Sequence, residues 1–151
     1  MTDLLATDKE LYREGASHAL AGYQMIEELL KTYIGNYFGI VRSLVQDKIY
    51  FGFRKQDYKQ APLGRLLQTF DKICADKELV AALRAEVPHR DHIAHQSLLV
   101  LFAKSQPTPE DFSKLLEDLT VRNSAIQAVM LQLHAAHKSL ITPYSSSKDR
   151  A

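Results

Sequence analysis

Apolar residues recur every three or four positions over most of this chain, which is the spacing that places them on one face of an α-helix. The first run predicts a long helix that begins near Asp8 and ends near Val45. A shorter run predicts a second helix over 63–74, opened by Pro62, because a proline fits the first helical turn. The stripe of the first helix comprises Ile26, Leu29, Leu30, Tyr33, Ile34, Tyr37, Phe38, Val41, Leu44 and Val45.

The second half of the chain continues the same period. Residues 76–87 predict a helix that Pro88 ends or kinks, since a proline inside a helix removes a hydrogen bond and clashes with the preceding turn. A further helix is expected from Pro88 onwards, with its packed side marked by Ala94, Leu98, Leu101 and Phe102. The last helix is expected to follow an N-cap at Thr108, before Pro109 and two acidic residues.

These elements predict an all-α fold, an up-and-down bundle of four to five helices. The 151 residues fit one domain, expected over 1–141, and the polar end of the chain, 142–151, is expected to be a disordered tail. Nineteen basic and eighteen acidic residues give a net charge of +1, so binding to nucleic acid must be local. A single cysteine and a start without signal-peptide features predict a cytoplasmic protein, and no apolar run approaches the about 20 residues that span a membrane.

Residues 50–60, between the first two helices, break the helical period and mix aromatic with basic side chains. We expect a loop there or a small hairpin. Arg54, Lys55 and Tyr58 offer cations and a stacking face, the combination with which proteins bind single-stranded RNA. Aromatic side chains that pack on the edge of the bundle would give the same pattern, so both interpretations stay open.

Two polar residues, Arg122 and Asn123, interrupt the apolar stripe of the last helix. A buried charge is costly unless it is paired and hydrogen-bonded, so their inward position needs a reason. They either line a cleft near Arg90 and bind substrate, or Arg122 forms a structural ion pair with a carboxylate such as Glu27 or Glu28.

The most informative chemistry lies in the stretch that holds Arg90, Asp91 and His95. Pro88 would place this stretch at a helix start, where free backbone N–H groups and the helix dipole favour anions. An imidazole can transfer protons near neutral pH, and a guanidinium can stabilise negative charge on a phosphorane. Other pairs with the same spacing, such as Arg13 with His18, lack the combination of a polar residue after the arginine and an alanine before the histidine.

The order arginine, polar residue, alanine, histidine over 90–95 resembles the signature of the HEPN superfamily of small helical-bundle proteins. The segment Pro62–Leu67 resembles the short Leu-Gly-Arg/Lys-Leu helix that precedes the motif in several branches. The resemblance implies metal-independent cleavage of single-stranded RNA without a cofactor. His95 would then be the acid/base residue, Arg90 the phosphate clamp and Asp91 the orienting carboxylate.

In many members of this superfamily two copies of the motif face each other, so the resemblance also implies a homodimer. A toxin or defence role would imply an antitoxin or another protein partner. Toxin-type members carry a tyrosine two residues after the histidine, where this chain has Ser97. A non-catalytic helical adapter with the same fold is the alternative. No metal site is expected, because His89, His92 and His95 drift around a helix.

Overall fold

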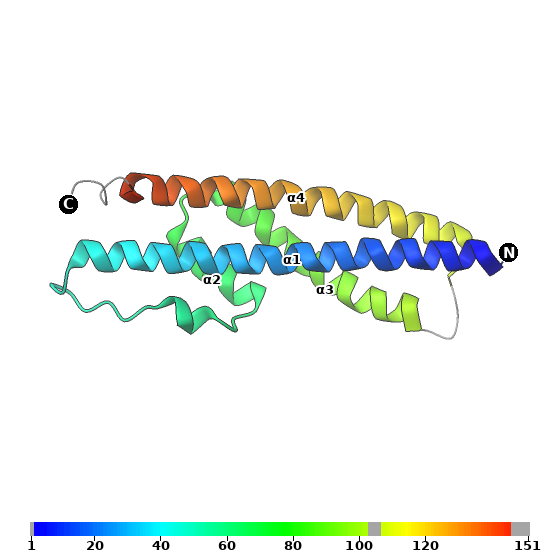
Figure 1. The fold of residues 1–151 in the computed structure, drawn as a ribbon, viewed down its shortest axis with the longest axis horizontal. Coiled ribbons are helices and arrows are strands. Elements are labelled where there is room, and N and C mark those ends of the chain that lie inside the picture. Colours follow the sequence, from blue (N-terminus) through cyan, green and yellow to red (C-terminus); the bar gives the residue numbers. More distant parts are fainter. Residues whose placement is uncertain (1, 103–106, 146–151) are drawn as a thin grey trace. The chain divides into compact units, whose positions relative to one another are not determined.

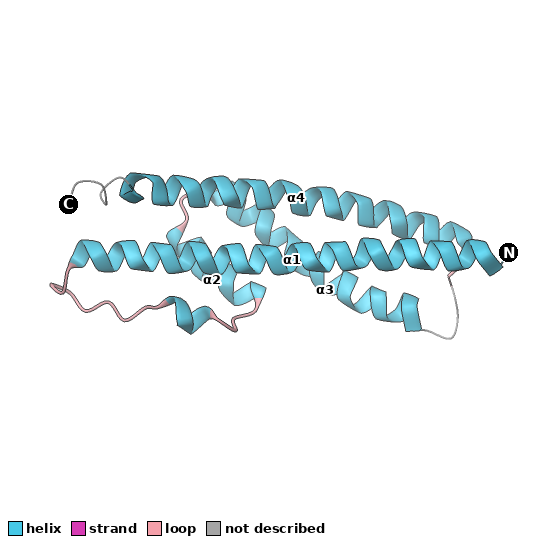
Figure 2. Cartoon of the chain, viewed as in Figure 1, coloured by secondary structure: helices cyan, strands magenta, loops and turns pink. Residues whose placement is uncertain are grey.

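The structure, a computed structural model, describes residues 2–102 and 107–145, and within these ranges every regular element is a helix (Figures 1 and 2). The α-helices are α1 (Thr2–Val45), α2 (Leu63–Ile73), α3 (Lys77–Phe102) and α4 (Pro109–Ser145), and a short 3-10 helix, η1, covers Lys55–Tyr58. The predicted all-α class is confirmed. The hairpin that was one option for residues 50–60 does not form.

The two longest helices, α1 and α4, extend beyond their expected ends. α1 begins at Thr2 rather than near Asp8. α4 continues through Pro143 to Ser145, so it includes the first residues of the segment expected as a tail, and positions 146–151 lie outside the described residues. None of the described helices combines the length and the apolar character that a membrane span requires.

Side-chain caps explain where α3 and α4 begin. The backbone N–H of Asp111 donates to Thr108 Oγ1, and the N–H of Thr108 donates back to Asp111 Oδ2, both at 3.2 Å. This reciprocal pair satisfies backbone donors that the first turn leaves free, so the N-cap predicted at Thr108 is confirmed. Before α3, Asp76 plays the same part, because its Oδ1 accepts the N–H of Leu79 at 3.0 Å.

Pro88 neither ends α3 nor begins a new helix, so these two expectations were wrong, whereas a kink at Pro88 stays a prediction. The helix is continuous from Lys77 to Phe102, with Pro88 in its interior. A proline removes one backbone hydrogen bond there, and the burial of Leu83 and Ile93 on either side holds the helix together across it. Arg90 and its neighbours therefore lie in a helix interior, not beside the free N–H groups of a helix start.

The chain divides into two compact units, and α1, α3 and α4 each contribute a segment to both. Unit 1 consists of Met1–Gln24 and Ala85–Ala128, and unit 2 of Met25–Arg84 and Val129–Ala151. The core of unit 1 contains Tyr12, Ala16, Ala19, Tyr23, Ile93, Val100, Phe112, Leu119 and Ile126. The core of unit 2 contains Ile26, Leu30, Ile34, Leu66, Leu67, Phe70, Leu79, Leu83 and Leu133. The single domain expected over 1–141 stays a prediction.

Two glycines allow α1 and α4 to approach closely within unit 1. A Cβ on Gly22 would lie 2.6 Å from Ile126 Cγ2, and a Cβ on Gly15 would lie 3.1 Å from Leu119 Cδ1. The later residue of α1, Gly22, meets the later residue of α4, Ile126. The two helices therefore run in the same direction here, as Figure 1 shows.

The last turns of α3 pack with a different face from the one expected. Leu98 and Phe102 are 60% and 77% exposed, whereas Val100 between them is 3% exposed. Residues two positions apart on a helix point about 200° apart, so both lie opposite the buried Val100. The expectation that Leu98 and Phe102 mark the packed side was wrong, and the outward face of these last turns of α3 is apolar.

Candidate functional site

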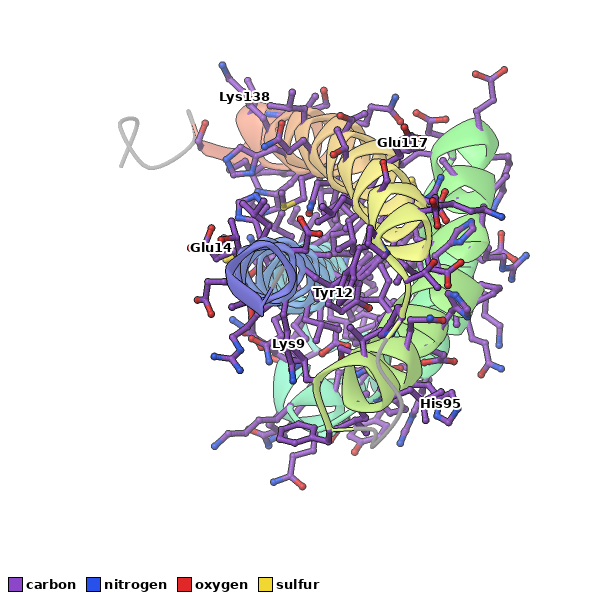
Figure 3. The ribbon with its side chains drawn as sticks, turned by 90° about the vertical axis from the view of Figure 1, so that its right-hand side faces the viewer. Lys9, Tyr12, Glu14, His95, Glu117 and Lys138 are labelled. Atoms are coloured by element: carbon purple, nitrogen blue, oxygen red, sulfur yellow. The ribbon has the colours of Figure 1, made fainter. Side chains whose placement is uncertain are left out.

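Arg90, Asp91 and His95 lie on the part of α3 that belongs to unit 1. The guanidinium of Arg90 contacts Asp91 Oδ1 at 3.1 Å, and both side chains are well exposed, at 43% and 66%. His95 is exposed and points away from the interior (Figure 3). Asp91 is one helical turn before His95 on the same face, whereas Arg90 points about 140° away from His95. One copy of the chain therefore brings Asp91 near each of the other two but does not bring Arg90 and His95 together.

A cavity of about 440 Å³ lies between α3 and α4 in unit 1. Arg122 lines it, together with His89 and His92 of the motif segment. Tyr12 of α1 also lines it, and this residue is buried. The other lining residues are His89, His92, Ile93 and Gln96 from α3, and Leu115, Asp118, Leu119 and Val121 from α4. Arg90 is not among them.

Arg122 also takes part in a buried network. Its Nη1 donates to Glu86 Oε1 at 3.1 Å, and the hydroxyl of Tyr23 donates to Glu86 Oε2 at 2.8 Å. Burial, and then the Glu86 carboxylate, raise the pKa of Tyr23, so this hydroxyl stays protonated as a donor. The structure pairs Arg122 with Glu86, and not with Glu27 or Glu28 as expected. Glu86 lies on the buried face of α3 and is only 5% exposed.

Asn123, the neighbouring candidate, joins α4 to α1. Its Nδ2 donates to the backbone carbonyl of Gly15 at 3.3 Å, and the side chain is half-buried. Its Oδ1 is buried and has no hydrogen-bond partner within the described part of the chain. The structure therefore places this amide between helices and not in the cavity that Arg122 lines.

The loop before α2 gives its three candidate residues different surroundings. These residues are Arg54, Lys55 and Tyr58. Tyr58 is 8% exposed, with its ring 5.8 Å from that of Phe38 and 5.7 Å from the guanidinium of Arg65. It is therefore assigned to packing, the alternative that the sequence left open, rather than to stacking on a base. Arg54 is exposed, and its backbone N–H donates to an Asp57 carboxylate oxygen at 3.0 Å. Lys55 lines a cavity in unit 2.

The histidines of the motif segment do not converge. His89 and His92 line the cavity in unit 1, whereas His95 is not among its lining residues. Across residues 2–102 and 107–145, no group of three histidine, cysteine, aspartate or glutamate side chains is arranged to hold a metal ion.

Comparison with protein-family models, curated proteins and solved structures finds no significant match to this chain. The resemblance to the HEPN superfamily rests on residues 62–67 and 90–95 and stays a prediction.

Proposed function

We propose that this protein is a metal-independent endoribonuclease of HEPN type that cleaves single-stranded RNA in the cytoplasm, as a toxin or defence component. The observation that carries the proposal is the exposed imidazole of His95, one helical turn after an Asp91 carboxylate that holds Arg90 at 3.1 Å. A proton-transfer group, an orienting carboxylate and a phosphate-binding cation thus occur within six residues of one helix.

The reaction follows from these groups. The imidazole of His95 takes the proton of a ribose 2′-hydroxyl, and the 2′-oxygen attacks the adjacent phosphorus. The guanidinium of Arg90 stabilises the added negative charge on the phosphorane, and Asp91 orients the imidazole. The bond from phosphorus to the 5′-oxygen then breaks, and this oxygen receives a proton from an imidazolium. The products are a 2′,3′-cyclic phosphate and a 5′-hydroxyl.

A homodimer would complete such a site. Arg90 and His95 point about 140° apart, so clamping and proton transfer at one phosphate need groups from two copies. The exposed face of α3 continues from His95 into Leu98 and Phe102, and neighbouring exposed apolar side chains are typical of interaction surfaces. This face supports pairing of α3 with α3 of a second copy.

The same apolar face also supports the alternative, a helical adapter that binds another protein such as an antitoxin. Leu98 and Phe102 would then contact the partner, and Arg90 with Asp91 would be a surface ion pair without catalytic function. Such a protein would bind its partner and leave RNA intact.

The two functions are separated by an RNA-cleavage assay in the presence of a chelator, with wild type beside His95→Ala. We expect wild type to produce cyclic-phosphate ends and His95→Ala to be slower by about 10²–10⁴-fold. His18→Ala is the matched control, because His18 is also exposed and follows an arginine at the same spacing. Cleavage that requires a metal ion, or an equal loss in both variants, would contradict the assignment, and intact RNA with wild type would favour the adapter.

A further inference from the structure

We propose that unit 2 contains a separate binding site for a chain of phosphate groups. A cavity of about 490 Å³ between α1 and η1 is lined by Glu28, Lys31, Lys55, Gln56 and Lys59. Its three ammonium groups exceed its single carboxylate by two positive charges. The carboxylate of Glu28 already contacts Lys31 at 2.9 Å, and within the described ranges no carboxylate pairs with Lys55 or Lys59. The excess positive charge of the cavity therefore favours an anionic ligand.

Lys31 provides a fixed cation on the α1 wall of this cavity. Its side chain is only 14% exposed, whereas lysine side chains on a protein surface are usually well hydrated. The contact with Glu28 three residues earlier holds the ammonium group in place. A cation that is positioned before the ligand arrives loses less conformational entropy on binding.

Gly35 positions the second lysine. A Cβ on Gly35 would lie 2.8 Å from both Cγ and Cδ of Lys55, and 3.0 Å from its Cβ. The aliphatic stem of Lys55 thus lies directly against the α1 backbone, where any other residue would displace it. These atoms are the near part of the side chain, so the clash could not be relieved by rotating the ammonium end alone. Gly35 is a positioning residue that directs Lys55 along the cavity.

The basic surface continues into a second cavity of about 310 Å³ that shares Gln56 and Lys59 with the first. Arg65 and Asp57 also line it, and the Asp57 carboxylate already accepts the backbone N–H of Arg54. Cations therefore follow one another from Lys31 to Arg65 along two adjoining cavities. An extended ligand with several phosphates matches this arrangement better than a single phosphate ion does. An RNA strand and a free polyphosphate share this chemistry.

The site is independent of the proposed cleavage, because none of its residues lies on α3. Two probes test it on the full chain: inorganic tripolyphosphate and a 2′-O-methylated single-stranded oligoribonucleotide, which has no 2′-hydroxyl for cleavage. We expect at least one probe to bind. Lys55→Gln and Lys59→Gln should each weaken binding by about tenfold or more. For the oligoribonucleotide, each should also lower the salt dependence by about one charge.

The decisive variant is Gly35→Ala, which changes no charge and should still weaken binding by about tenfold. Gly39→Ala is the matched control: it makes the same change one turn later on α1, where an added Cβ meets nothing within 4 Å, and should bind as wild type does. Binding of only one probe would identify the source of the phosphates. The proposal fails if neither probe binds, if Gly35→Ala binds as tightly as wild type, or if Lys55→Gln and Lys59→Gln, both folded by circular dichroism, bind as tightly as wild type.

Discussion

The hydroxyl of Tyr23 and the carboxylate of Glu86 lie 2.8 Å apart inside unit 1, and Arg122 binds the other oxygen of the same carboxylate at 3.1 Å. Each oxygen of a nearly inaccessible carboxylate thus has a donor, one from α1 and one from α4. This arrangement ties three helices together next to the cavity that Arg122 lines. A buried charge with donors on both oxygens is stable only while the donors remain.

Arg122→Ala should therefore destabilise the protein by about 3 kcal/mol, because it leaves the Glu86 carboxylate buried without its counter-charge. Tyr23→Phe should remove one charged hydrogen bond, which is worth about 2 kcal/mol. Denaturant unfolding measures both changes. The control is Glu117→Ala, an exposed position on the outer side of α4 (Figure 3), which should change stability by less than about 0.5 kcal/mol. Equal values for Arg122→Ala and Glu117→Ala would contradict the role of this network.

Gly22→Ala tests the close approach of α1 to α4. The new Cβ would lie 2.6 Å from a methyl group of Ile126, which is buried and cannot move away freely. Overpacking costs about 1–3 kcal/mol, more than the about 1 kcal/mol that alanine gains over glycine in a helix. We expect a net loss of about 1 kcal/mol in thermal or denaturant unfolding. Gly39→Ala should instead stabilise by about 1 kcal/mol, and a similar gain from Gly22→Ala would show that the helices are not in close contact there.

The helices could be predicted because the apolar residues of each one recur with a helical period in the sequence. The continuation of α3 through Pro88 could not be predicted in this way. A proline inside a helix is unfavourable by about 3 kcal/mol, but this local preference was overridden at Pro88 by packing on both sides. The outward face at Leu98 and Phe102 was misassigned because apolar residues at helical spacing do not reveal whether another helix covers them.

The candidate site could be predicted only where chemistry is local in the sequence. Arg122 was recognised because a charge interrupts an apolar stripe, yet its partner Glu86 lies 36 residues away and a lone glutamate has no pattern of its own. The same holds for the basic cavity, where Lys31 joins Lys55 only through the fold. The contact of the Lys55 stem with the α1 backbone at Gly35 likewise joins residues that are far apart in the sequence.

His137 should make the stability of unit 2 depend on pH. Burial, and then the charge of His134, lower the pKa of His137 below its ordinary value of 6.5. Its Nε2 lies 2.7 Å from Asn36 Nδ2 and accepts the amide hydrogen while the ring is neutral. The unfolded state therefore binds a proton more tightly than the folded state. The contribution of His137 to stability should be complete above pH 6.5 and should decrease as the pH falls through the folded pKa.

Unfolding experiments on either side of pH 6.5 measure this contribution. His137→Gln should lose less stability on acidification than wild type does. His18→Gln, at an exposed histidine of α1, should lose as much as wild type. Identical pH profiles for wild type and His137→Gln would contradict the assignment.

The outward face of α3 should decide both the oligomeric state and the activity under the proposed function. We expect wild type to be a dimer in light scattering, and Leu98→Asp to be a monomer, because a carboxylate would be buried in the interface without a partner. If the active site needs two copies, the same variant should lose RNA cleavage although Arg90, Asp91 and His95 are unchanged. Leu131→Asp is the control: Leu131 is a comparably exposed leucine on α4, and the variant should remain dimeric and active. A monomeric wild type at micromolar concentration would contradict the expected dimer, and a monomeric Leu98→Asp that cleaves RNA at the wild-type rate would show that one copy is sufficient.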